Sequence, residues 1–189
     1  MKTLTRPVTI LPALLCLLLV SPAMAQETAA GNWYLDMGLG INWLDQESGH
    51  PQPADAGFRL SLACGHHFNP NWALELETGY LRNSSPAVDD RAEFTLNQVP
   101  LLLNLVHLFP TRTSLKPYIG VGAGVLIESG NDDTGGDAGL QAMIGVRHVL
   151  DARKSIGLGY RFIMMGATSA LAEEPVGNDT LLLDLKLAL

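Results

Sequence analysis

Eight charged side chains stand out, because each lies in a stretch of sequence where every second residue is apolar. Four are acidic and four are basic: Asp36, Glu75, Glu77, Asp184, Arg59, Arg147, Arg161 and Lys186. In an extended strand they fall on the face opposite to the large apolar residues. A buried charge without a partner costs several kcal/mol, so charges on an enclosed face must be paired or hydrated. We therefore expect an interlocked network of ion pairs, with separately hydrated charges as the alternative.

Motifs for catalysis and metal binding are weak by comparison. A nucleophilic serine needs a base within hydrogen-bonding reach, and Ser155 and Ser169 have no obvious partner. His66 and His67 are adjacent, so they face opposite sides of a strand and cannot chelate one metal ion together. We therefore predict that the protein is not an enzyme, and that it holds no metal ion and no cofactor.

The alternation that positions the charges is strongest in residues 179–189, which read D-T-L-L-L-D-L-K-L-A-L. One face carries Leu181, Leu183, Leu185, Leu187 and Leu189. The other face carries Thr180, Asp184, Lys186 and Ala188, with Leu182 as the exception. A soluble strand this apolar needs a second layer over it. In a membrane β-barrel the hydrocarbon covers the leucines and the polar face looks into the lumen, so we predict the closing strand of such a barrel.

Residues 1–25 have the features of a secretory signal peptide. Lys2 and Arg6 precede an apolar run at residues 8–20, and A-M-A at residues 23–25 fits a cleavage site. Residues 26–189 then form one domain, in which Cys64 is the sole cysteine. Without Lys2 and Arg6, ten of the twelve Lys and Arg remain against nineteen Asp and Glu, a net charge of −9. That acidity argues against nucleic acid as a partner.

The same alternation recurs along the mature chain and predicts eight strands. We expect them at about residues 32–44, 57–68, 72–82, 92–108, 117–128, 137–150, 155–165 and 179–189. The predicted fold class is therefore all-β, an eight-stranded antiparallel up-and-down transmembrane β-barrel. In the strand at 92–108, Phe94, Leu96 and Leu102 occupy the polar parity. A bulge near Pro100 is expected to reconcile its two halves.

The predicted connections alternate in length and charge. Short turns at residues 69–71, 109–116 and 151–154 hold Arg112, Lys116, Arg153 and Lys154. Longer connections at 45–56, 83–91, 129–136 and 166–178 hold nine of the nineteen Asp and Glu residues. Bacterial outer-membrane barrels have an even number of strands, short periplasmic turns and longer extracellular loops. We therefore expect a protein of the bacterial cell outer membrane, with both chain ends in the periplasm.

Aromatic residues mark the ends of the predicted strands. Trp33 and Trp43 stand ten residues apart, which is roughly 25 Å along the membrane normal for a tilted strand. That is the height of the apolar band of such barrels. We expect the interfacial anchors to be Trp33, Trp43, Trp72, Tyr80 and Tyr160. A tryptophan at each end of a soluble sandwich strand is the alternative.

Four segments carry a resemblance to a known family. They are Q-V-P-L-L-L-N-L and K-P-Y-I-G-V-G-A-G-V-L within residues 98–126, G-V-R-H-V-L at 145–150 and G-L-G-Y-R-F at 157–162. The chain resembles the eight-stranded outer-membrane β-barrel family of the outer-membrane protein A/X type. The resemblance implies insertion by the barrel-insertion machinery, which reads the C-terminal strand. The family's last residue is usually phenylalanine, and here it is Leu189.

The expected function is that of a small outer-membrane β-barrel with a structural or surface-interaction role and a lumen plugged by ion pairs. Outer-membrane lipid is the expected partner, and the acidic loops are the expected site for a surface ligand. Two alternatives remain open at this stage. One is a soluble periplasmic ligand-binding barrel, which would put the apolar faces inside. The other is a narrow pore or a lipid-modifying barrel enzyme.

Overall fold

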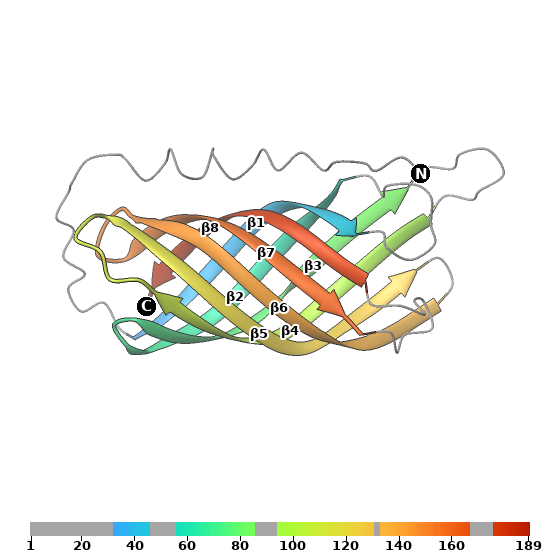
Figure 1. The fold of residues 1–189 in the computed structure, drawn as a ribbon, viewed down its shortest axis with the longest axis horizontal. Coiled ribbons are helices and arrows are strands. Elements are labelled where there is room, and N and C mark those ends of the chain that lie inside the picture. The colour runs from blue at the N-terminus through green and yellow to red at the C-terminus, as the bar shows by residue number, and fades with distance from the viewer. Residues whose placement is uncertain (1–31, 46–55, 86–93, 131–132, 167–175) are drawn as a thin grey trace, which may run out of the picture.

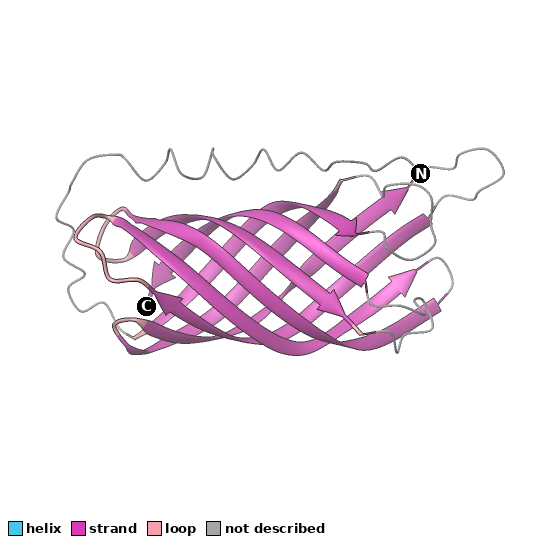
Figure 2. Ribbon diagram, in the orientation of Figure 1, coloured by secondary structure: helices cyan, strands magenta, loops and turns pink. Residues whose placement is uncertain are grey.

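The computed structural model describes residues 32–45, 56–85, 94–130, 133–166 and 176–189. In these ranges the regular elements are β1 Trp33–Asp45, β2 Gly57–Asn69, β3 Trp72–Ser85, β4 Phe94–Leu108, β5 Leu115–Gly130, β6 Asp133–Val149, β7 Lys154–Met165 and β8 Val176–Ala188. Each strand pairs antiparallel with the next, and β1 pairs with β8 to close the barrel (Figures 1 and 2). The predicted fold class is confirmed. The predicted signal peptide at residues 1–25 lies outside the described residues.

The seam between β1 and β8 is continuous. It runs from Tyr34 opposite Ala188 to Asp45 opposite Gly177 without a register shift. The backbone N–H of Leu189 adds a hydrogen bond of 2.9 Å to the carbonyl of Trp33. Figure 1 shows that the C-terminus and the short turns gather at one end of the barrel.

The apolar rows of the described strands face outward. Leu39, Val121 and Leu183 expose 61%, 62% and 61% of their surface. The inward-facing residues next to them in sequence are glycine or buried side chains, for instance Leu182 at 0% exposure. A soluble barrel with these rows inside is therefore wrong for this chain. The described residues contain no helix that is long and apolar enough to cross a membrane.

The expected bulge near Pro100 is wrong. The register of β4 against β5 runs through Pro100 without a shift, and its pairing with β3 keeps one register on both sides of that residue. Leu96 and Leu102 face inward and are 7% and 0% exposed. Leu102 breaks the polar pattern because it packs in an apolar part of the lumen, against Leu126 and Ile163. The register shift lies instead between His67 and Asn69, where β2 meets β3.

The expected acidic loop at residues 129–136 is also wrong. Strands β5 and β6 stay paired as far as Gly130 opposite Asp133, which leaves residues 131–132 as their connection. Connections of two residues are common in β-hairpins. Gly135 and Gly136, read as loop residues in the sequence, lie in β6 opposite Glu128 and Ile127. The long connections at residues 46–56, 86–93 and 166–175 remain between the other strands.

Inward-facing glycines make room for large side chains across a narrow interior. A β-carbon added at Gly65 would lie under 3.0 Å from the ring of Tyr34. One added at Gly145 would lie 2.6 Å from the ring of Tyr118. An eight-stranded barrel is just wide enough for side chains to fill. A large residue on one strand therefore requires a small residue on a neighbouring wall.

Replacing Gly65 with alanine is expected to destabilise the barrel by about 1–3 kcal/mol, the usual cost of overpacking. The new methyl group would displace the Tyr34 ring, whose hydroxyl donates a 2.6 Å hydrogen bond to Glu75. Urea unfolding of the protein refolded into lipid vesicles measures the change. The matched control is Gly136→Ala, whose methyl group would have its nearest neighbour 3.7 Å away. Equal losses of stability in the two variants would contradict the steric argument.

Candidate functional site

Glu77 of β3 organises one group of polar side chains inside the barrel. Arg59 of β2 donates from Nη2 to Glu77 Oε1 at 2.8 Å, and Arg161 of β7 forms an ion pair with the same carboxylate. Asn104 and Gln141 donate to Glu77 Oε2 at 2.7 and 3.0 Å. All five residues are at most 3% exposed. One carboxylate thus neutralises one of two guanidinium groups, so this cluster carries one net positive charge.

Arg147 of β6 organises a second group nearer the short turns. Its Nη2 lies 2.5 Å from Asp36 Oδ2 of β1 and 3.1 Å from Asp184 Oδ1 of β8. The guanidinium carbon also lies 5.2 Å from the ring centroid of Tyr118, a cation–π contact. Here one cation meets two carboxylates, so this cluster carries one net negative charge.

The remaining two predicted charges lie at the short-turn end of the lumen. Glu75 Oε1 accepts a hydrogen bond of 2.6 Å from the hydroxyl of Tyr34. Lys186 Nζ lies 3.6 Å from the ring centroid of Tyr34 and 2.6 Å from Nε2 of His67. The same tyrosine therefore contacts an acid through its hydroxyl and a cation through its ring.

The structure places all eight sequence-predicted charged residues in the interior, each at most 7% exposed. Six of them form the two ion-paired groups around Glu77 and Arg147. Glu75 and Lys186 meet through Tyr34 and His67, neither of which the sequence analysis assigned to the charge network. Tyr34 shares the inward parity of Asp36, so the alternation of β1 was the signal that could have revealed it.

A group of amide side chains near the long connections was also missed. Asn42 donates to Asn83 Oδ1 at 2.6 Å, and Asn178 donates to the same oxygen at 3.4 Å. Gln98 donates to Glu128 Oε1 at 2.8 Å. These residues are at most 4% exposed and occupy inward positions of five different strands. The amides escaped notice because the sequence analysis searched for charges, and it did not place Glu128 among the inward-facing charges.

Two clusters of apolar side chains also lie in the described lumen. One comprises Leu102, Leu126, Ile163 and Met165. The other comprises Val106, Leu108, Tyr118 and Met143. The sequence signal for them was their parity, which is that of the inward charges. The described interior therefore contains apolar clusters as well as the predicted charged side chains.

The five predicted aromatic anchors lie on the outer face, where four are exposed and Tyr80 is half-buried. Trp33 and Trp72 begin β1 and β3 at the short-turn end and are 54% and 36% exposed. Their rings pack against His66 and His107, with centroids 4.7 and 4.5 Å apart. Nearer the long connections lie the other three, Trp43, Tyr80 and Tyr160.

The two outer tyrosines bind polar groups on their neighbouring strands. Tyr80 donates a hydrogen bond of 2.5 Å to Asn97 Oδ1, and Tyr160 donates to Asp179. An apolar ring with a bonded hydroxyl suits the boundary between lipid and water. Within the described residues, no group of three or more His, Cys, Asp and Glu is arranged to hold a metal ion.

Replacing Glu77 with glutamine is expected to lower the free energy of unfolding by about 3–5 kcal/mol, because Arg59 and Arg161 then share no carboxylate. Urea unfolding in vesicles measures this change. The control is Glu75→Gln on the same strand, whose amide oxygen can still accept the Tyr34 hydrogen bond. Its cost should be clearly smaller. Adding Arg161→Met to Glu77→Gln should restore part of the loss, and equal costs for the two glutamine variants would contradict this account.

Comparison with known proteins agrees with this architecture. Residues 13–185 match the outer membrane protein beta-barrel domain family. Neisserial surface protein A has a similar crystal structure, with a TM-score of 0.63 and 17% sequence identity over 85% of this chain and 99% of that chain. The crystal structure of OprG, an outer membrane protein of Pseudomonas aeruginosa, is also similar. Its TM-score is 0.53 and its sequence identity is 13%, over 86% of this chain and 99% of that chain. No curated protein matches the chain. The chain belongs to the outer membrane protein beta-barrel domain family and is a bacterial outer-membrane protein.

Proposed function

We propose that the barrel is a closed scaffold, which contributes to the integrity of the outer membrane and presents its long loops at the cell surface. The observation that carries the proposal is the set of contacts that join opposite walls of the lumen. Arg59 on β2 donates to Gln141 on β6 at 2.9 Å. Arg161 on β7 pairs with Glu77 on β3. In an eight-stranded ring each of these strand pairs stands four places apart, so the side chains span the diameter.

The layers on either side of the Glu77 cluster support the same role. Toward the long connections lie the apolar cluster of Leu102 and its neighbours, and then the amide side chains around Asn178. Toward the short turns lie the Arg147 cluster and the apolar cluster of Met143. A hydrated ion crossing the lumen would have to break ion pairs and enter an apolar layer. Both steps are costly in a region of low dielectric constant.

The wild-type protein is expected to give no stable conductance steps in a planar lipid bilayer, because its ion pairs and apolar clusters occupy the lumen. The purified, refolded full chain is added to one side, and the current is recorded at moderate voltage. The control is the same bilayer with detergent alone. Large steps of uniform size from the wild type would contradict a closed scaffold and would favour the narrow pore.

The role in surface interaction rests on the charge of the long connections. Asp89, Asp90 and Glu93 lie together in one of them, within a mature chain of net charge −9. Ligand specificity in scaffold proteins resides in loops. We propose a basic surface ligand for these loops. We also propose that the insertion machinery engages β8, after which Leu189 is 64% exposed.

Polylysine is a simple probe for an acidic loop surface. The full chain in neutral lipid nanodiscs is expected to bind it in a salt-sensitive way, because screening weakens exposed charge pairs. Replacing Asp89 and Asp90 with asparagine and Glu93 with glutamine should weaken that binding. The control Asp151→Asn removes an acid at the opposite end and keeps an acceptor for the turn, so it should bind as the wild type does. Binding unaffected by the triple replacement would contradict the role of this loop.

A further inference from the structure

We propose that the short-turn end of the barrel binds the phosphate headgroups of anionic phospholipids in the leaflet that surrounds it. The residues concerned, called the basic rim below, are Arg112, Lys116, Arg153 and Lys154. They follow β4 or β6 in the short turns, or begin the next strand. The inference builds on the membrane location of the barrel and does not depend on a closed lumen.

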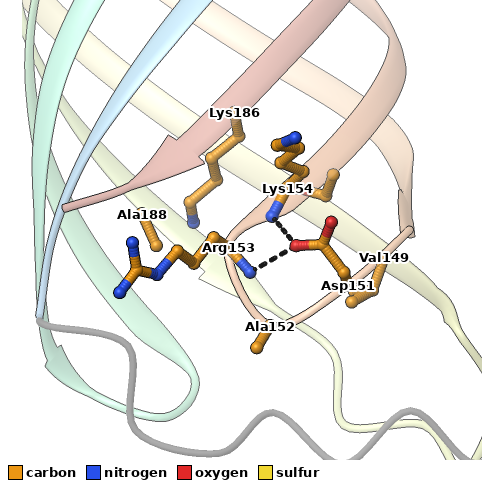
Figure 3. Close-up of a pocket in the computed structure, with 8 residues that line it drawn as sticks. Val149, Asp151, Ala152, Arg153, Lys154, Lys186 and Ala188 are labelled. Atoms are coloured by element: carbon orange, nitrogen blue, oxygen red, sulfur yellow. Dashed lines mark hydrogen bonds between the residues drawn. The ribbon is translucent and has the colours of Figure 1, made fainter.

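The basic rim is exposed and has little acid to neutralise it. Arg112, Arg153 and Lys154 are exposed. Lys116 is half-buried and donates to the carbonyl of Thr111 at 3.0 Å. The described acid in these turns is Asp151. Its Oδ1 is already committed to the turn, where it accepts the backbone N–H groups of Arg153 and Lys154 at 2.7 and 2.9 Å (Figure 3).

The basic rim adjoins the lipid-facing surface directly. Leu150 and Ile156 flank the β6–β7 turn on the outer face and are 51% and 41% exposed. Phe109, 40% exposed, begins the turn that contains Arg112. The cations therefore stand just beyond the apolar band, at the depth where lipid phosphates lie. Long basic side chains at such positions place their stems along the apolar surface and their charges at the headgroups.

A small recess beside the β6–β7 turn strengthens the case for a headgroup. Its volume is about 30 Å³, and its lining includes Arg153, Lys154, Ser155 and Lys186. Figure 3 shows that Lys186 enters it from β8, while Arg153 and Lys154 come from the turn. Space of this size admits one water molecule or one phosphate oxygen. Two residues of the basic rim, Arg153 and Lys154, thus line a recess that admits one oxygen of a lipid headgroup.

The tryptophans provide a local readout of the lipid at this end. The chain has three tryptophans, and the variant Trp43→Phe keeps Trp33 and Trp72, which both lie at the short-turn end. This parent variant is refolded into phosphatidylcholine vesicles that contain an equal minor fraction of brominated phosphatidylglycerol or brominated phosphatidylcholine. Bromine at one chain depth in both lipids quenches tryptophan equally unless the headgroup enriches one lipid. Symmetric vesicles make the orientation of the barrel irrelevant.

Brominated phosphatidylglycerol is expected to quench the tryptophan fluorescence more than brominated phosphatidylcholine does. The expected local enrichment of phosphatidylglycerol is about fivefold at low salt, which corresponds to the attraction of one cation to an anionic lipid surface. The enrichment should fall toward one at high salt, because the Debye length drops to about 3 Å at 1 M. Replacing Arg112, Arg153 and Lys154 with glutamine should abolish it. The control Arg82→Gln removes an exposed arginine of β3 nearer the long connections and should leave it unchanged.

Equal quenching of the parent variant by the two brominated lipids would overturn the proposal. So would an excess that survives in the triple variant. The salt titration of the parent variant tests the electrostatic origin even if the triple variant refolds poorly. A planar-bilayer current from the same protein bears on the closed lumen alone, so the two proposals can fail separately.

Discussion

The narrowness of the eight-stranded barrel is the constraint on which the rest of this structure depends. Side chains from opposite walls meet in the middle, so every inward position has to be complementary to another. Glu77, for example, accepts hydrogen bonds from two arginines and two amides, which an apolar side chain could not do. The rings of Tyr34 and Tyr118 lie against Gly65 and Gly145, glycines of the neighbouring strands. The same crowding is the basis of the closed scaffold proposed above.

The eight predicted charges are balanced overall but not locally. The Glu77 cluster holds one excess cation, and the Arg147 cluster holds one excess anion. Glu75 and Lys186 add one charge of each sign, so the eight residues sum to zero. Adjacent clusters of opposite sign attract each other along the barrel axis, which lowers the cost of removing each from water. Glu128 and Asp137 are two further buried acids, nearer the long connections.

The parity of the residues was enough to predict which side chains face lipid and which face the lumen, because one strand period of two applies throughout. It could not predict partners. Arg161 and Glu77 meet across the barrel and not along one strand pair, and such contacts depend on tilt and register, which the sequence does not state. The position of a residue in the alternation also predicts its direction better than its polarity does. Leu96 and Leu102 are apolar, which suggests a bulge, but they face inward as their positions require. The segment at 129–136 is rich in Gly and Asp, which suggests a loop. In the structure most of these small residues continue the paired strands of the β5–β6 hairpin.

The seam between β1 and β8 joins the two most distant parts of the described chain. Tyr34 stands opposite Ala188, so this pairing has a far greater sequence separation than any hairpin in the barrel. Contacts of that kind form late, since the entropy of closing so large a ring must be overcome first. Until β8 arrives, β1 presents an open edge with its backbone groups unpaired, which hydrocarbon does not tolerate. Entry into the bilayer and completion of the fold are therefore expected to be a single event, governed by the arrival of the final strand.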